Sequence, residues 1–165
     1  MKRINVPITN EDIDKLNVGD TLYLSGTIFC GRDMVLPKLI NDLKDRDMPE
    51  LDGSVIFHTA VSVAGIGPTS SNKIEIESSI IPLSKHGVKI HLGKGKIKQE
   101  TVNQLSENNS VYAITPPVTA LFNDKISSCE VIAYGELGME AFYKLEVSDI
   151  PIIIAAAHGR SIYDK

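Results

Sequence analysis

The order of apolar and polar positions along the chain predicts many strands with a few helices between them. Residues 21–29 are β-branched and partly alternating, so they predict a strand in which Gly26 is a bulge or a point of close approach. The same signals predict further strands at residues 54–63, 88–92, 111–115, 128–134, 141–147 and 152–157. This pattern is typical of a mixed α/β fold with a sheet-built core and flanking helices.

Two short helices are predicted where capping residues precede apolar positions. Thr9 offers an N-cap for a helix that Gly19 would end. Asp33 is expected to cap a second helix, with Pro37 in its first turn, where a missing N–H matters little. The apolar face of this helix is predicted to consist of Leu36, Leu39, Ile40 and Leu43.

Two longer helices complete the predicted architecture. Residues 74–85 predict one helix with a break at Pro82 and an end at Gly87, and residues 98–107 predict another with a polar face. No repeat, low-complexity tract or Pro/Gly/Ser linker divides the chain. We therefore expect one domain over residues 1–165.

The composition favours buried strands and excludes several kinds of site. The chain has 165 residues, 42% of them hydrophobic, with 21 Ile, 12 Val and no Trp. Its only two cysteines, Cys30 and Cys129, exclude a disulfide scaffold. Two cysteines by themselves also cannot hold a zinc ion or an iron–sulfur cluster. Both thiols are predicted to be buried or inert.

The net charge and the apolar runs exclude some classes of binding partner and indicate the compartment of the protein. The net charge of −4 argues against general nucleic-acid binding. The longest apolar run, residues 150–157, contains Pro151 and is too short to span a bilayer. No apolar h-region follows the first residues, so no signal peptide is visible. We expect a soluble cytoplasmic protein that binds neither membranes nor nucleic acid.

The first place that could carry chemistry is the stretch from Gly26 to Asp33, where a strand leads into a helix. Backbone N–H groups at the helix start, with Arg32 beside them, make a plausible anion site. An arginine can grip a carboxylate through two parallel hydrogen bonds, which suits a small organic acid. The alternative is that Arg32 is a surface residue and Asp33 merely a cap.

Two further glycine-containing turns carry hydroxyls and cations. Gly67-Pro68 precedes the hydroxyls of residues 69–71, and Lys73 lies four residues beyond Thr69. These hydroxyls can be helix N-caps, or one of them can act as an acid or base if a neighbouring charge lowers its pKa. Lys94 lies between two glycines after a predicted strand and could reach an anion, or it could belong to a solvated basic turn.

The four histidines show no metal-binding spacing. His86 and His91 are expected at the surface or on a strand face. His58 and His158 lie near predicted strand ends, where each could hydrogen-bond a backbone group or line a cleft.

The glycine-containing motifs occur in an order that identifies a family resemblance. In sequence they are Val18-Gly19-Asp20, Leu24-Ser25-Gly26-Thr27, Gly31-Arg32-Asp33, Gly67-Pro68-Thr69-Ser70, Gly93-Lys94-Gly95, Glu136-Leu137-Gly138-Met139-Glu140 and His158-Gly159. The series resembles the β subunit of class I, iron–sulfur-dependent fumarate hydratases and L-tartrate dehydratases, which is equivalent to the C-terminal domain of the single-chain enzymes. The likeness runs from about Val18 to Tyr163.

The resemblance implies a swivelling β/β/α domain and an active site shared with an α subunit. In that family the α subunit supplies the cysteines for a [4Fe–4S] cluster. Arg32 and Lys94 match the family's carboxylate-binding cations, and Lys73 matches a third cation, usually an arginine. Thr69 matches the threonine proposed to remove a proton from the carbon next to a carboxylate. No metal ligand is expected in this chain.

Several positions depart from the family pattern. Leu36 stands where a histidine commonly follows G-R-D, and Lys73 exchanges a bidentate fork for a point charge. The usual H-A-G-P stretch appears as His58-Thr59-Ala60-Val61. The doubled-glycine motifs become Gly93-Lys94-Gly95-Lys96 and Pro116-Pro117-Val118-Thr119-Ala120.

The resulting hypothesis is the β subunit of a heteromeric iron–sulfur hydro-lyase that hydrates fumarate to malate reversibly and is active only with its α subunit. L-tartrate dehydratase is the next hypothesis, and a hydratase of a related hydroxy acid is a third. A hypothesis of another class is a divergent, non-catalytic assembly or anion-binding module that retains the fold. The expected partners are the α subunit and a small dicarboxylate.

Overall fold

The computed structural model describes residues 2–59, 61–62, 65–66, 73–115 and 125–163. Its strands are β1 Lys2–Asn5, β2 Thr21–Cys30, β3 Val55–Phe57, β4 Val61–Ser62, β5 Gly65–Ile66, β6 Ile90–Gly93, β7 Val111–Ile114, β8 Ile126–Ala133, β9 Phe142–Ala157 and β10 Arg160–Ser161. Its helices are α1 Asn10–Asp14, α2 Leu36–Asp42, α3 Lys73–Lys85 and α4 Gln99–Glu107, with the 3-10 helices η1 Pro49–Leu51 and η2 Gly135–Glu140. Within these ranges, every helix is too short or too polar to cross a membrane.

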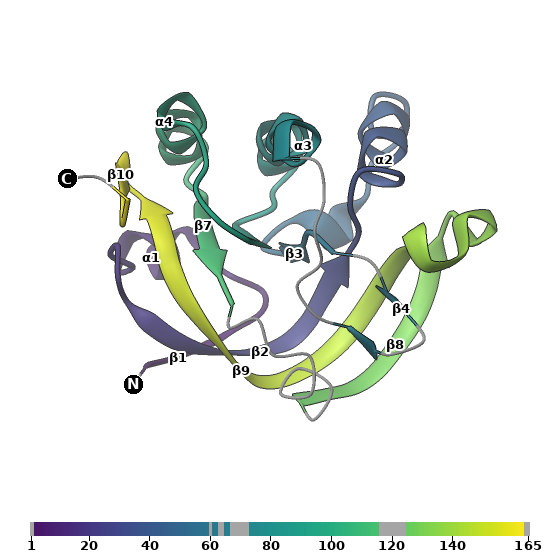
Figure 1. The fold of residues 1–165 in the computed structure, drawn as a ribbon, viewed down its shortest axis with the longest axis horizontal. Coiled ribbons are helices and arrows are strands. Elements are labelled where there is room, and N and C mark those ends of the chain that lie inside the picture. The colour runs from purple at the N-terminus through teal and green to yellow at the C-terminus, as the bar shows by residue number, and fades with distance from the viewer. Residues whose placement is uncertain (1, 60, 63–64, 67–72, 116–124, 164–165) are drawn as a thin grey trace.

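The main sheet is mixed and closes on itself. Strands β1, β2, β3, β6 and β7 are parallel neighbours. The long strand β9 pairs antiparallel with both β7 and β2, which closes the ring β2–β3–β6–β7–β9. Helices α2, α3 and α4 lie side by side over one side of this sheet (Figure 1). The predicted mixed sheet with flanking helices is therefore confirmed.

Side chains alternate between the inside of the ring and the helix layer, as the two-residue period of a strand requires. The inside is filled by aliphatic residues of all five strands, including Ile28, Leu92 and Ile152. On the other face, Phe29 and Ile56 pack with the apolar residues of α2. Each fully buried side chain of this size contributes about 1.5–3 kcal/mol relative to exposure. The two cores therefore fix the strand ends relative to the helices.

Of the two alternatives predicted for Gly26, a bulge or a point of close approach, the close approach is confirmed, and the bulge lies in β9. The β2–β9 register shifts between Leu24 and Gly26, where one residue of β2 faces two of β9. Gly26 has φ +121°, and a Cβ there would lie 3.1 Å from the Val6 side chain. A larger residue at this position would both strain the backbone and push β1 away.

The predicted strands 141–147 and 152–157 are wrong as two elements, because they form the single strand β9. Of the four residues that separate them, Ile150 and Pro151 are paired with β2, and Ser148 and Asp149 form the bulge opposite Ser25. There Asp149 takes φ 52° and its backbone N–H donates to the Ser25 hydroxyl at 2.8 Å. Pairing continues through Pro151, which lies opposite Tyr23.

Capping is confirmed for the first predicted helix and wrong for the second. Thr9 and Asp12 form a reciprocal capping box at the start of α1, which ends at Asp14 rather than at Gly19. Asp33 does not cap α2. The Arg32 carbonyl accepts from the backbone N–H groups of Val35 and Leu36 instead, so the helix begins one turn after Arg32.

The remaining predicted elements are present with changed bounds. Helix α3 continues through Pro82, so the predicted break there is wrong; a proline in the last turn removes one hydrogen bond without ending the helix. The predicted strand 54–63 is split, since β3 ends at Phe57. The Thr59 N–H donates back to the Phe57 carbonyl at 2.9 Å, which turns the chain out of the sheet.

Candidate active site at the carboxyl edge of the sheet

Four parallel strands end side by side at one edge of the ring. Their register aligns the last inward-facing residues of the four strands, which are Cys30, Phe57, Leu92 and Ala113. The residues two positions further along each strand leave the sheet at the same edge, and they are Arg32, Thr59, Lys94 and Thr115. The fold thus brings the predicted cations Arg32 and Lys94 to one edge, with the exit of β3 between them. In open and in closed α/β sheets alike, ligands commonly bind at the carboxyl ends of the parallel strands.

Buried polar atoms without partners concentrate at this edge. Among the described residues, the buried side-chain atoms that lack a hydrogen-bond partner are Asp33 Oδ1, His58 Nδ1, Thr115 Oγ1 and Ser54 Oγ. The first three follow the carboxyl ends of β2, β3 and β7, and only Ser54 lies at the amino end of β3. Such atoms are rare in folded proteins. Their grouping marks the carboxyl edge as the place where a polar ligand would complete the structure.

Arg32 is held in a defined orientation by Glu140, the last residue of η2. The Arg32 Nε donates to both Glu140 carboxylate oxygens at 2.9 and 3.1 Å, and Nη2 donates to Oε1 at 2.5 Å. The two side chains are 23% and 19% exposed, so Arg32 is half-buried and not a freely solvated surface residue. The hydrogen bond to Glu140 raises the pKa of Arg32, and burial opposes this shift only in part. Arg32 is therefore a fixed cation.

The segment that carries Glu140 is docked against α2. The Tyr134 hydroxyl donates to the Asp42 carboxylate of α2, and the turn between β8 and β9 lies beside that helix (Figure 1). The carboxylate of Asp33 also faces Arg32, with Oδ1 at 3.7 Å from Nε. Two carboxylates thus surround one guanidinium, and the local charge of this cluster is negative.

Lys94 lies in a turn whose shape depends on its two glycines. A Cβ at Gly93 would lie 2.7 Å from the Tyr112 hydroxyl, so only glycine lets the Tyr112 side chain cross the end of β6. That hydroxyl donates to the Gly95 carbonyl at 3.1 Å, and Gly95 itself has φ +81°. Burial raises the pKa of Tyr112, which keeps it a neutral donor. The anchored turn presents Lys94 as an exposed side chain.

A chain of three buried side chains runs through the helix-facing layer to the exit of β3. The Ser84 hydroxyl of α3 lies 2.8 Å from His91 Nε2, and His91 Nδ1 lies 3.0 Å from His58 Nε2. Burial lowers the pKa of His58 to about 3 and that of His91 well below its ordinary value, so both rings are neutral at pH 7. His91 is thus a strand-face residue, as predicted.

The other predicted residues fall into two groups. Thr69 lies outside the described residues, and of Lys73 the structure describes the backbone, at the start of α3, but not the side chain. His158 contacts the Leu16 carbonyl through Nε2 at 2.8 Å, which confirms the predicted backbone hydrogen bond, and His86 is exposed as expected.

The two cysteines do not make a cluster site. Cys30 is buried as predicted; its thiol donates to the Thr59 carbonyl at 3.1 Å, and burial raises its pKa. Cys129 is exposed on β8, so of the predicted alternatives, buried or inert, burial does not apply to it. No group of three metal-ligating side chains occurs in the part of the chain that the structure describes. The described residues therefore do not fit a [4Fe–4S] cluster, which needs three or four ligands of this kind.

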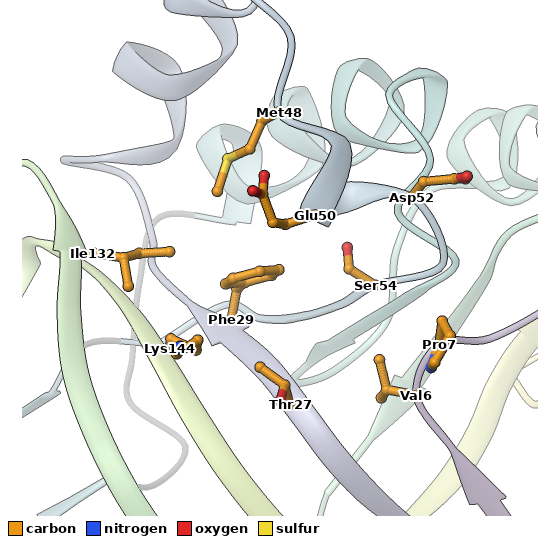
Figure 2. A pocket seen from close by; sticks show the side chains of 10 residues that line it. All are labelled: Val6, Pro7, Thr27, Phe29, Met48, Glu50, Asp52, Ser54, Ile132 and Lys144. Atoms are coloured by element: carbon orange, nitrogen blue, oxygen red, sulfur yellow. The ribbon is translucent and has the colours of Figure 1, made fainter.

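A cavity of about 540 Å³ lies elsewhere, between the curved part of the sheet and η1. Figure 2 shows the ring of Phe29 lying across it, with Glu50 and Ser54 pointing into it from the segment before β3. None of Arg32, Lys94 or His58 lines this cavity. It is separate from the edge where the candidate residues meet.

Comparison with known proteins identifies the family. The family model described as Fumarase C-terminus matches residues 1–165. The chain belongs to this family. It is 33% identical to "Putative L(+)-tartrate dehydratase subunit beta" of Methanocaldococcus jannaschii, in an alignment covering 96% of this chain and 89% of the relative. It is 32% identical to "L(+)-tartrate dehydratase subunit beta" of Escherichia coli (strain K12), covering 98% and 87%.

A third relative has a different length. "Putative fumarate hydratase class I" of Geobacillus stearothermophilus is 31% identical over 98% of this chain, which spans only 33% of that relative. Chains of this family thus occur both at nearly the length of the present one and as part of a protein about three times as long. The resemblance inferred from the motif series is confirmed.

Sequence reasoning missed the residues that surround the cations. Glu140 belongs to a motif of the family series, yet no local signal connects it with Arg32, more than a hundred positions earlier. Thr115 lies in no motif, and Thr59 lies in the stretch that replaces the family's H-A-G-P, where it was not singled out. Only the register of β3 and β7 reveals them.

Proposed function

We propose that the chain is the β subunit of a hydro-lyase that adds water reversibly to fumarate, with an active site completed by an α subunit. The carrying observation is the convergence of Arg32 and Lys94 at the carboxyl edge of a chain that belongs to the fumarase C-terminal family. In this proposal residues 1–165 act as one swivelling β/β/α domain, and the [4Fe–4S] cluster is held by the α subunit in the cytoplasm.

The described cations suit a dicarboxylate because they approach from two sides. Arg32 is a guanidinium oriented by Glu140 through Nε and Nη2, and Lys94 offers an exposed point charge. One strand exit separates them, so we propose that each binds a different carboxylate of the substrate. Fixed cations stabilise the additional negative charge that builds on a carboxylate as the adjacent C–H bond breaks.

We assign the proton transfer to Thr69 and the third cation to Lys73, on the family pattern alone. In the dehydration direction the deprotonated Thr69 oxygen would take the proton from the carbon next to a carboxylate and become the neutral hydroxyl. The electron pair of that C–H bond forms the double bond, and hydroxide leaves the neighbouring carbon. Because α3 returns the chain from the exit of β3 to the start of β6, its first residue, Lys73, belongs to the end of the helix nearer the carboxyl edge.

L-tartrate is the second candidate substrate. It is favoured by the names of the two relatives that match this chain over most of their own length. Fumarate and tartrate share the four-carbon dicarboxylate frame, so the same two cations serve both. Choice between them would depend on the half of the pocket contributed by the α subunit.

The test is co-expression with an α subunit from the same genome under anaerobic conditions, followed by assays with fumarate and L-tartrate. We expect a co-purifying complex that turns over one of the two acids and loses that turnover in Arg32→Ala. Arg3→Ala is the matched control, because Arg3 is 70% exposed and pairs with Asp149 away from the edge. Equal loss in both variants, or failure of the two chains to co-purify, would contradict the proposal.

A further inference from the structure

The buried chain Ser84–His91–His58 ends in a ring nitrogen whose role the motif series does not explain. His58 is 3% exposed and His91 is wholly buried, so bulk water does not satisfy their ring nitrogens. Three of the four ring nitrogens, together with the Ser84 hydroxyl, are used in two hydrogen bonds. His58 Nδ1 is the one left over among the described residues, and the backbone of His58 lies at the exit of β3, between the Arg32 and Lys94 turns.

The proton order along this chain has only two possible arrangements, because each neutral imidazole carries one N–H. If the Ser84 hydroxyl donates to His91 Nε2, then His91 Nδ1–H donates to His58 Nε2, and the His58 proton must be on Nδ1. If the order is reversed, the Ser84 hydroxyl accepts instead of donating, and His58 Nδ1 becomes a bare acceptor.

The first arrangement leaves fewer groups unsatisfied. The Ser84 proton is then donated to His91, and one group, the His58 Nδ1–H, has no hydrogen-bond partner among the described residues. The reversed order leaves both a hydroxyl proton and the His58 lone pair without a partner among the described residues. Buried orphan groups are costly, so the hydroxyl sets the direction of the chain. The order of protons thus makes His58 Nδ1 a donor.

We propose that Ser84, acting through His91, fixes His58 as a neutral N–H donor to an oxygen of the anion bound at the carboxyl edge. His58 would then be a further substrate-binding residue, and Ser84 and His91 positioning residues. The inference rests on the proposed function for the identity of the anion, a small dicarboxylate. A neutral donor between two cations adds a directed hydrogen bond without adding charge, and its acceptor gains the full contact because water does not compete.

The kinetic test uses the co-purified complex with fumarate and L-tartrate. His58→Phe keeps the ring volume and removes the donor, and we expect KM to rise about 10-fold to 100-fold, the effect of losing one hydrogen bond to a charged group. His58→Asn places an amide N–H near the position of Nδ1 and should restore part of the loss. Ser84→Ala should give a smaller rise, and the exposed-residue controls His86→Gln and Ser106→Ala should give none.

A spectroscopic measurement keeps the inference separate from the proposed function. With ¹⁵N-histidine in this chain only, NMR of the full-length chain at pH 7 should show His58 protonated on Nδ1 and not on Nε2. Ser84→Ala should mix the two tautomers. Succinate, which cannot be dehydrated, should shift the His58 Nδ1–H signal when added to the complex.

Three results would overturn the inference. They are a His58 proton on Nε2, an unchanged His58 signal at saturating succinate, and a His58→Phe variant whose KM equals that of His86→Gln while it remains folded. If the complex turns over neither acid, the proposed function fails; the tautomer measurement still decides the proton order.

Discussion

The Arg32 turn and the Lys94 turn place cations at the same edge by different means. Arg32 is half-buried and held by three donor–acceptor contacts to Glu140. Lys94 is exposed, and only the backbone of its turn is anchored, through the bond from Tyr112 to Gly95. The guanidinium of Arg32 is therefore fixed in orientation, whereas for Lys94 only the position of the backbone is fixed.

The difference teaches what each side chain can contribute to anion binding. A guanidinium held side-on recognises the plane of a carboxylate, so its geometry matters as much as its charge. An exposed ammonium acts as a point charge and tolerates changes in shape. The two turns should consequently respond differently to the same kind of substitution.

The largest expected effect comes from Arg32→Lys, which preserves charge and removes the fork. We expect KM for the turned-over acid in the complex to rise about 100-fold, nearly as much as in Arg32→Ala, because truncating one partner of a hydrogen-bonded charge pair costs about 2–5 kcal/mol. Steady-state kinetics at fixed ionic strength measure this. A Lys variant that behaves like wild type would show that charge alone suffices at this position.

The exit of β3 differs from the two turns beside it in that a pair of buried histidines, His58 and His91, leads to it, and their contribution to stability depends on pH. His58 and His91 have folded-state pKa values below the unfolded value of about 6.5, and that of His58 is about 3. Below pH 6.5 the unfolded chain therefore binds protons that the folded chain excludes. We expect the free energy of unfolding to fall by about 1.4 kcal/mol per pH unit for each ring and to be insensitive to these rings above pH 6.5.

Urea titrations between pH 4 and 8 check this dependence. Carboxylates also titrate in acid, so the double variant His58→Gln/His91→Gln supplies the baseline, and His86→Gln is the exposed control. The account requires a shallower acid slope in the double variant only. Equal slopes in all three proteins would mean that the two rings are not held neutral.

A smaller effect is expected at Lys94. Lys94→Ala should raise KM about 5-fold to 10-fold and reduce its salt dependence, since an exposed charge is screened. Lys94→Arg should change KM less than 2-fold, in contrast to the exchange at Arg32. Lys96→Ala, two residues further in the same exposed turn, is the control. A large loss in Lys94→Arg would place this side chain in a fixed geometry as well.

The smallest expected effect concerns the anchor of the Lys94 turn. Tyr112→Phe removes the hydrogen bond to the Gly95 carbonyl and leaves the ring packing intact. We expect the free energy of unfolding to fall by about 1 kcal/mol, the usual net value of one such bond, with a rise in KM smaller than that of Lys94→Ala. Chemical denaturation and kinetics on the same preparation compare the two quantities.

Local signals in the sequence predicted most of the elements that build the edge. Alternation located β2, β6 and β7, and helical spacing located the apolar face of α2 through Leu36 and Leu39. The capping box at Thr9 was predictable because its two partners are three residues apart. These are short-range effects, which a single sequence records directly.

What the sequence did not predict depends on contacts between distant segments. Strand β1 carries a weak pattern and exists because β2 offers it a parallel edge. The continuity of β9 depends on a bulge shared with Ser25, and the orientation of Arg32 depends on Glu140. The positions of Arg32 and Lys94 were predicted, and their surroundings required the register of the closed sheet.

The central claim is that Arg32 and Lys94 hold one dicarboxylate together. The most direct measurement is the dissociation constant of succinate for the complex, by calorimetry, in two charge-matched double variants. Arg32→Ala/Lys94→Ala removes the pair at the edge, and Arg3→Ala/Lys96→Ala removes the same charge from exposed positions. The account predicts a loss of affinity of more than about 100-fold in the first and less than about 2-fold in the second. Equal affinities in the two variants would contradict it.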